Sequence, residues 1–403
     1  MLAETASSSE APQHAGYRVA YLVNFLAPDL VAICRAWAKL VGRLDVIVSV
    51  PMEGNRHWTP CHDDLNVTVQ RTWTISKVDR HPSGYDDVNY VHIPLDTYKQ
   101  LRSLQPAVIV SAEMGARSLV TSVYCCMNRR VKHVVAVSTS EHIEQSRDGW
   151  LRRLQRRWLL RRADAVTYHG ESCRQYLLNL GVPGVRLFPW IYAADPTKPY
   201  RGEILATSTD TNEVRLLTVG QLIDRKGVLI ALHELAQWAT EHPDHTVRWL
   251  LIGNGPMEST IRALPIPENM QLEFAGHCSS QEIQAAYRDH ELLLFPTLGD
   301  EWGLVVDEAM HSGLAVIGSN KAQSCQMLIR PGTNGYLFDP AASQSLAAQL
   351  TSWAKLSASE RMAMRHAARR SVSDRTPENS ARQIASLTNR LFSLFCEEQT
   401  RML

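Results

Sequence analysis

The sequence predicts an α/β protein made of two Rossmann-like domains that face each other across a cleft. Short apolar runs rich in branched residues alternate with helical patterns, as strands buried on both faces of a parallel sheet require. The alternation stops in a polar segment with Pro and Thr at 193–213, and then starts again. A chain of 403 residues, 45% of them apolar, is long enough for two such cores.

The first half of the chain carries five candidate strands. The segment 51–95 interrupts them, and its irregular pattern predicts a long excursion with weak strands. Helices are expected at 30–41 and 116–128. The strands are predicted at 17–23, 45–50, 107–112, 133–138 and 163–169.

The second half repeats the alternation with six candidate strands. Ser279 and Glu282 have the spacing of a capping box at the start of one of its helices. Helices are expected to begin near residues 227, 256, 280 and 304. The strands are predicted at 214–220, 247–253, 272–276, 291–296, 314–319 and 335–339.

These patterns divide the chain into five segments. The beginning is polar and lacks the basic and apolar regions of a signal peptide. A last helical pattern follows the second alternating half. We therefore expect a flexible tail at 1–16, an N-terminal domain at 17–195, a linker at 196–213, a C-terminal domain at 214–375, and a helix at 376–403 that can pack across the domains.

Composition narrows the class of protein. The formal net charge of +1 gives no reason to expect nucleic-acid binding, which usually needs a strong basic excess. The eight cysteines are scattered without a CxxC pair, so we expect no zinc site and a reducing compartment. No apolar run is long enough to cross a bilayer, and a cytoplasmic location is expected.

Glycine and positive charge follow the first strand of the second half, in the stretch VGQLIDRKG. Gly220 lets a ligand approach the backbone closely, and Arg225 and Lys226 lie at a helix start, where anions are attracted. Taken alone, the pattern fits a phosphate site and an ordinary turn with solvated charges equally well. After the second strand, Gly253 and Gly255 permit a tight turn, which is most often purely structural.

The third strand of this half ends before His277 and Cys278. Because ligands of such sheets lie beyond the carboxyl ends of the strands, this loop can frame a heterocyclic base with its backbone. A structural role is the more common one for such residues.

The fourth strand leads into FPTLGDEWGLVVDEAMHSG, where carboxylates stand on both sides of a helix start. Asp300 precedes the unpaired amides of Gly303, Leu304 and Val305, and Glu308 follows them on the helix. Amides suit a diphosphate, and carboxylates accept hydrogen bonds from sugar hydroxyls. The alternative is that Asp300 caps the helix and Glu308 faces solvent.

In order and spacing, VGQLIDRKG, LIGNGP, FAGH, DEWGLVVDEAMHSGLAVIGS and PGTNGYLFDP resemble the C-terminal domain of the retaining glycosyltransferases of family 4, which have the GT-B fold. The resemblance is strong from about 214 to 340. In the first half, the segment 156–183 looks like the stretch that leads to the family's interdomain linker. The resemblance implies a donor-binding C-terminal domain and an acceptor-side N-terminal domain.

The resemblance also implies roles for the two acidic positions. Glu308 matches the family's second glutamate, which binds the nucleotide ribose. The first position falls on Asp300, since 302–304 matches the aromatic-Gly-Leu core, and Glu301 is its neighbouring substitute. Gln221 stands where the family often has an arginine that assists the diphosphate-binding lysine, here Lys226.

Lys226, Asp300 and Glu308 are therefore the expected catalytic residues. The expected donor-binding residues are Gly220, Gln221, Arg225, Gly253, Gly255, His277, Glu301, Trp302, Gly303, Leu304 and Val305. The resemblance implies transfer of a hexose from a nucleoside-diphosphate sugar to a hydroxyl of a glycan or lipid-linked acceptor. The anomeric configuration is retained, with no obligatory metal and no cofactor.

On the acceptor side, three residues follow predicted strands and point to the cleft. Glu113, Glu141 and His142 are candidates for contacts with the donor sugar or the acceptor. For His142, an ordinary polar loop histidine is the favoured alternative. No protein nucleophile is expected, because the leaving phosphate can itself deprotonate the acceptor.

The stretch WLRRLQRRWLLRR at 150–162 predicts a basic amphipathic helix. Trp150, Leu154 and Trp158 recur at helical spacing beside arginines. Such a stripe usually packs into a core, and this is our expectation here. The alternative is a peripheral contact with the inner face of a membrane.

Two other functions remain in competition with an active glycosyltransferase. The replacements at Asp300 and Gln221 allow a non-catalytic scaffold that binds sugar nucleotides through a degenerate GT-B fold. A dinucleotide-dependent oxidoreductase is the third hypothesis, and the lack of a GxGxxG motif counts against it.

Overall fold

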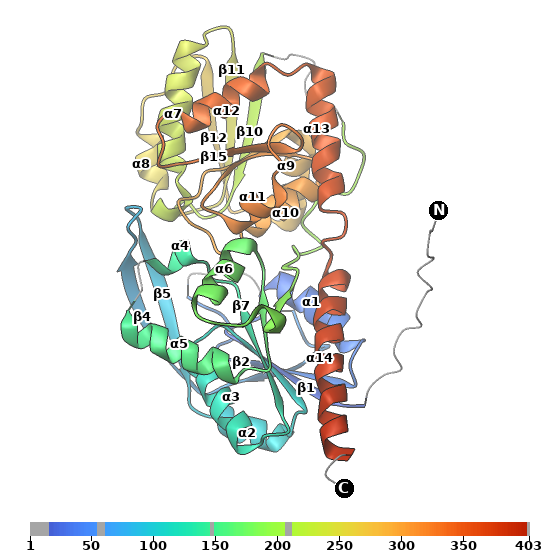
Figure 1. Ribbon diagram of the computed structural model, residues 1–403. Helices are drawn as coiled ribbons and strands as arrows, with labels where there is room; N and C mark the ends of the chain where they lie inside the picture. Colours follow the sequence, from blue (N-terminus) through green and yellow to red (C-terminus); the bar gives the residue numbers. More distant parts are fainter. Residues whose placement is uncertain (1–15, 55–60, 146–148, 206–211, 401–403) are drawn as a thin grey trace.

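The computed structural model describes residues 16–54, 61–145, 149–205 and 212–400. The tail expected at 1–16 lies, apart from its last residue, outside the described residues. Two parallel sheets form the two halves of the molecule, stacked end to end in Figure 1. The predicted class, α/β with two Rossmann-like units, is confirmed.

The N-terminal half is built on a seven-stranded parallel sheet in the order β3-β2-β1-β6-β7-β8-β9. Its strands are β1 Arg18–Val23, β2 Arg43–Val48, β3 Asn66–Val69, β6 Val108–Ala112, β7 Lys132–Val137, β8 Ala165–Tyr168 and β9 Leu187–Pro189. Its α-helices are α1 Pro28–Ala38, α2 Thr97–Leu104, α3 Ala116–Met127, α4 Glu141–Glu144, α5 Trp150–Arg162 and α6 Glu171–Asn179.

The C-terminal half is built on a six-stranded parallel sheet in the order β12-β11-β10-β13-β14-β15. Its strands are β10 Glu213–Val219, β11 Thr246–Ile252, β12 Met270–Gly276, β13 Leu292–Phe295, β14 Ala315–Ser319 and β15 Gly335–Phe338. Its α-helices are α7 Val228–Glu241, α8 Glu258–Arg262, α9 Ser280–Asp289, α10 Leu304–His311, α11 Gln323–Leu328, α12 Ser345–Ala354 and α13 Ala358–Ser371.

Both faces of each sheet are covered, which explains the nearly continuous apolar strands. Because side chains alternate along a strand, Val19 and Tyr21 of β1 join the core beneath α1. Ala20 and Leu22 of the same strand join a second core with α2 and α3. In the other half, the predicted capping box at Ser279 is present at the start of α9 and is confirmed.

The last helix, α14 Pro377–Thr400, returns to the N-terminal half. Its residues Ala381, Ile384 and Leu387 are buried in the same core as Trp37 of α1. In Figure 1 α14 lies beside the N-terminal sheet, although in sequence it follows the C-terminal half. The two halves are therefore joined by this helix as well as by the segment between β9 and β10.

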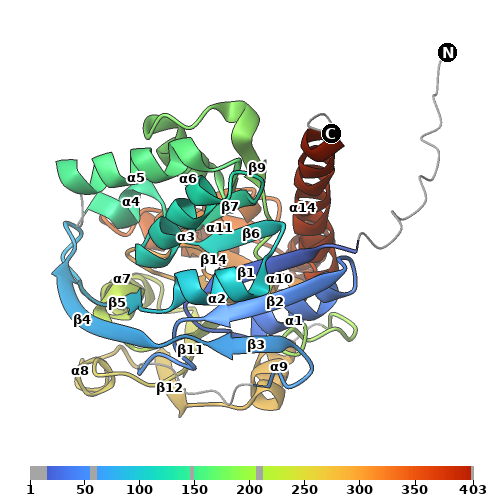
Figure 2. The ribbon, with the colours of Figure 1, turned by 90° about the horizontal axis from the view of Figure 1, so that it is seen from below.

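The irregular segment between β3 and α2 forms a separate antiparallel hairpin of β4 Thr72–Arg80 and β5 Asp86–Pro94. It stands apart from the large sheet at the left of Figures 1 and 2. The turn between its strands places Tyr85, which is buried, close to the loop after β13. The hairpin thus reaches the other half of the molecule.

Our expectation that the apolar stripe of the basic helix packs into a core is wrong. Trp150 and Leu154 of α5 are exposed, and the helix instead buries Arg156, Leu159 and Leu160. Arg156 is tolerated inside because Glu144 of α4 neutralises it at 2.6 Å. No helix in the described part of the chain is both long and apolar enough to span a bilayer.

Candidate functional site

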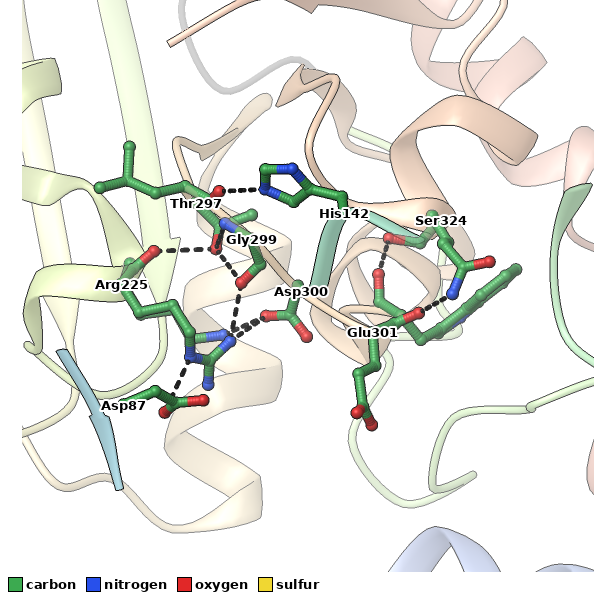
Figure 3. Close-up of polar contacts among 12 residues, drawn as sticks. Asp87, His142, Arg225, Thr297, Gly299, Asp300, Glu301 and Ser324 are labelled. Atoms are coloured by element: carbon green, nitrogen blue, oxygen red, sulfur yellow. Dashed lines mark hydrogen bonds and ion pairs between the residues drawn. The ribbon is translucent and has the colours of Figure 1, made fainter. Parts of the chain in front are cut away.

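Two loops of the C-terminal half bring opposite charges together beyond their strands. Lys226 follows β10, and Asp300 follows β13, which is the neighbour of β10 in the sheet. Lys226 Nζ lies 2.5 Å from Asp300 Oδ2, and Arg225 Nη1 lies 3.3 Å from the same atom. Arg225 also donates to the carbonyl oxygen of Gly299 at 2.9 Å, as Figure 3 shows. Two cations thus converge on one carboxylate.

The charge state of Asp300 follows from this pairing. Burial alone would raise its pKa, but Lys226 and Arg225 outweigh burial and lower the pKa to about 2. The carboxylate is therefore ionised at neutral pH and partly neutralises the two cations. The alternative that Asp300 caps α10 is wrong, because the N-cap residue is Gly303 and no side chain caps this helix.

Helix α10 begins beside this charge cluster. Gly303 has φ +95°, and a Cβ there would lie 2.7 Å from the Phe295 ring, so only glycine fits the turn. Trp302 is buried and donates from Nε1 to Asp307 at 2.6 Å, which fixes the start of the helix. Leu304 and Val305 form the first turn, where backbone amides have no intrahelical partner.

Glu308 lies farther along the same helix. Its side chain is only 6% exposed, so the alternative that it merely faces solvent is wrong. Oε2 accepts a hydrogen bond from Tyr287 of α9 at 2.9 Å. Oε1 lies 3.4 Å from Nζ of Lys198, which comes from the segment between the two halves.

The predicted glycines shape the neighbouring loops. Gly253 has φ +130°, and a Cβ there would lie 2.0 Å from the carbonyl oxygen of Gly220. The loop after β11 therefore packs directly on the loop after β10, which also holds Gln221. Gly255 makes a similar close approach to Leu222. His277 lies at the end of the edge strand β12 and is exposed.

The acceptor-side candidates lie at the strand ends of the N-terminal half. Glu113 follows β6 with an unusual φ of +63°, and its carboxylate accepts a hydrogen bond from the backbone of Ser138 at 3.1 Å. Burial raises the pKa of Glu113, although its bonds to Ser138 oppose that shift. Glu141 is the first residue of α4 and is exposed.

Three contacts join the two halves around the charge cluster. Nε2 of His142 donates to the carbonyl oxygen of Leu298 at 2.9 Å. The alternative of an ordinary loop histidine is therefore wrong, because His142 lies in α4 and bridges the two halves. Asp87 of the hairpin lies 3.6 Å from Arg225. Gln323 Nε2 donates to the carbonyl oxygens of Ser138 and Glu301 at 2.8 and 2.6 Å. Figure 3 shows the first two contacts and the backbone of Glu301.

A cavity of about 200 Å³ opens between the halves next to the Glu301 side chain. In Figure 3 that side chain points away from Asp300. Of the two adjacent carboxylates, only that of Glu301 lines the cavity. Most of the lining is apolar or aromatic. Within the described ranges, no group of three His, Cys, Asp or Glu side chains is placed to hold a metal ion. The lining residues include Tyr21, Phe25, Glu113, Ser138, Trp190 and Tyr192.

Sequence reasoning missed Lys198, Asp87 and Gln323. Lys198 lies in a polar segment whose pattern predicted only a linker. Asp87 and Gln323 lie far in sequence from the residues they contact, and neither stands in a motif with a recognised function. The contacts of these three residues become apparent only in the folded structure, where distant parts of the chain meet.

Two family models match the chain, one on each half. The model described as "Glycosyl transferase 4-like domain" matches residues 26–189, and "Glycosyl transferases group 1" matches residues 213–355. Fold and site thus define a glycosyltransferase. The chain belongs to the group 1, family 4-like glycosyltransferases, as its sequence motifs indicate.

Solved structures show the same architecture over nearly the whole chain. HepE of Anabaena, in complex with UDP, has a TM-score of 0.68 at 16% identity and covers 93% of this chain and 100% of that one. WaaG, a glycosyltransferase involved in lipopolysaccharide biosynthesis, has a TM-score of 0.63 at 17% identity, covering 92% and 99%. The fold is therefore GT-B.

Curated relatives match more locally. A D-inositol 3-phosphate glycosyltransferase of Corynebacterium kroppenstedtii is 27% identical over 190 residues, which are 44% of this chain. The match covers 40% of the relative, so less than half of its length is represented.

Proposed function

We propose that the protein transfers a hexose from a nucleoside-diphosphate sugar to a hydroxyl of a glycan or glycolipid, with retention of the anomeric configuration. One arrangement carries the proposal: Lys226 and the first turn of α10 stand at one end of a helix that also bears Glu308. The rise from Leu304 to Glu308, four residue steps along the helix, is about 6 Å. That separation suits a diphosphate at the helix start and the adjoining ribose at Glu308.

The charges support departure of the nucleoside diphosphate. Negative charge develops on the leaving phosphate in the transition state, and preorganised cations and amides lower the energy of that charge. Lys226 and Arg225 are held in place by Asp300, so they need no rearrangement to act. Asp300 would also position Lys226, which is the role we assign to it in place of direct contact with the sugar.

The acceptor is assigned to the N-terminal side of the same cleft. The cavity beside Glu301 is lined there by Glu113 and Ser138, and His142 lies at the contact between the halves. A hydroxyl bound in this cavity would lie near the donor-side loop that carries Asp300 and Glu301. Glu113 and His142 are proposed to contact the acceptor or the transferred sugar.

The similar solved structures suggest the first donors to test. The Anabaena HepE structures are complexes with UDP, with UDP and glucose, and with UDP-glucose. Because these proteins share only about one residue in six with this chain, the base and the sugar need a direct test. UDP-glucose is our first candidate.

A sugar-nucleotide-binding scaffold is the second candidate. It is favoured by the Lys226–Asp300 ion pair, because a carboxylate 2.5 Å from the ammonium competes with a phosphate for it. Membership of a glycosyltransferase family argues against the oxidoreductase hypothesis.

A thermal-shift screen with UDP, GDP, ADP and their sugars tests the donor site. We expect at least one nucleoside diphosphate to stabilise the protein, and Lys226→Met and Glu308→Gln each to reduce that shift. Glu268→Gln, at an exposed glutamate away from the site, is the matched control. If both site variants respond like the parent, the donor site is misassigned.

Turnover of the stabilising donor then separates an enzyme from a scaffold. Hydrolysis or transfer that depends on Glu308 supports the enzyme, and NMR of the product gives its anomeric configuration. Tight nucleotide binding without turnover across a panel of glycan and glycolipid acceptors would support the scaffold.

A further inference from the structure

Helix α5 presents an apolar stripe to solvent. Trp150 is 73% exposed, Leu151 63% and Leu154 60%. At 100° per residue these three side chains lie on one side of the helix, together with half-buried Trp158. Large apolar side chains that gather on an exposed helix face indicate an interaction surface.

The opposite side of α5 shows that this orientation is fixed. Leu159 and Leu160 are buried in a core with β7, β8 and α6. Arg156 on the same inner side is anchored by Glu144 at 2.6 Å. Turning the helix to bury its tryptophan would expose both leucines and break a buried ion pair. Packing of the inner side of α5 therefore leaves the apolar stripe exposed to solvent.

Positive charge borders the stripe. Residues Arg153, Arg157, Arg161 and Arg162 are exposed, and the helix contains no acidic residue. The guanidinium of Arg162 lies over the Trp158 ring at 4.3 Å. Apolar and indole groups flanked by arginines match the boundary of a bilayer with anionic headgroups, where the rings enter the interface and the charges meet phosphate.

The β4–β5 hairpin adds to the same side of the molecule. Trp73 is 62% exposed, and Ile75 pairs with Val91 on the same hairpin face, where both are exposed. In both ribbon views the hairpin and one end of α5 lie at the left edge (Figures 1 and 2). The views differ by a rotation about the horizontal axis, so this edge is a single side of the N-terminal half.

We propose that this side, which we call the α5 surface, docks on an anionic lipid bilayer. It consists of Trp150, Leu151 and Leu154 and the four exposed arginines, and the β4–β5 hairpin lies on the same side of the N-terminal half. Charge complementarity selects lipid over a second copy of the chain, because two such arginine-rich helices repel each other. The inference goes beyond the proposed transfer reaction, since it does not depend on the donor or on turnover.

Vesicle co-sedimentation of the full chain tests this proposal. The vesicles are phosphatidylcholine alone or a 7:3 mixture with phosphatidylglycerol, about as anionic as a charged leaflet. We expect binding to the mixed vesicles at low salt, at least tenfold weaker binding to the neutral ones, and weakening at 0.5 M salt. Trp150→Ser with Leu154→Ser, and Arg157→Gln with Arg161→Gln, should each weaken binding about tenfold or more.

Two controls isolate the surface. Val185→Ser and Arg330→Gln change exposed residues of the same kinds elsewhere and should bind like the parent. Each variant should unfold cooperatively at a melting temperature close to that of the parent, which shows that it is folded. Equal binding to both vesicle types, or α5 variants that bind like the parent, would overturn the proposal. So would self-association that depends on Trp150 without any vesicle binding, since the occupant would then be a second copy.

Discussion

Lys198 Nζ lies 3.4 Å from Oε1 of Glu308 and joins the segment between the two halves to helix α10. The Lys198 side chain is one-third exposed, whereas the Glu308 side chain is nearly buried. Glu308 first, and then Asp29 and Asp195, raise the pKa of Lys198 against the opposing effect of burial. Lys198 is therefore charged at neutral pH and is the cation that accompanies a buried carboxylate at the proposed ribose site.

Replacing Lys198 by methionine should weaken nucleotide binding. The variant leaves Glu308 buried without its cation, which disfavours the charged carboxylate that accepts the ribose hydroxyls. We expect about tenfold weaker binding, or ~1.4 kcal/mol, by calorimetry with the nucleoside diphosphate that stabilises the parent best. Lys198→Arg should restore most of the affinity, and Lys355→Met, at an exposed lysine, should not change it. Tighter binding by Lys198→Met would instead show that Lys198 blocks the site.

Replacing Lys226 by methionine should remove the preference for a diphosphate. In the proposed site the ammonium contacts the diphosphate, so the parent should bind a nucleoside diphosphate at least tenfold more tightly than the monophosphate. The variant should bind the two alike, because Glu308 and the base contacts remain. Calorimetric titrations with both nucleotides measure this ratio. An unchanged ratio in the variant would place the diphosphate elsewhere.

Replacing Gly303 by alanine should distort the start of α10. The left-handed backbone and the 2.7 Å approach to Phe295 both penalise a methyl group, at a cost of about 1–3 kcal/mol in the free energy of unfolding. Nucleotide binding should fall as well, because the first-turn amides move. Gly184→Ala is the control, since its backbone is not left-handed and a Cβ there would meet no atom within 4 Å. Urea unfolding of both variants checks the difference.

The fold was predictable because most strands are buried on both faces and their apolar runs are almost unbroken. The charge cluster was predictable in part, since Lys226 and Asp300 follow strands that are neighbours in such a sheet. Lys198 was not, because its partner lies 110 positions away and its own surroundings are polar. The orientation of α5 could not be settled either. Both of its sides contain apolar residues, and the sequence pattern does not show the Arg156–Glu144 pair that accompanies burial of the inner side.

Acidification should destabilise the protein through His133 of β7. Burial lowers the pKa of His133 to about 3, and its Nε2 lies 2.8 Å from Oγ of Ser111. Below pH 6.5 the His133 side chain binds a proton in the unfolded chain, whereas in the folded chain it stays neutral until about pH 3. The stabilising effect is thus complete above pH 6.5 and is lost as the pH falls, by about 3 kcal/mol between pH 6.5 and pH 4.

Urea unfolding at a series of pH values measures this loss. His133→Gln keeps a hydrogen-bonding group without the titration, so its free energy of unfolding should fall less steeply over the same range. His366→Gln, at an exposed histidine, should follow the slope of the parent. Asp300 does not confuse the comparison, because with a pKa near 2 it stays ionised throughout this window. If parent and His133→Gln lose stability in parallel, His133 is not the group that senses the pH.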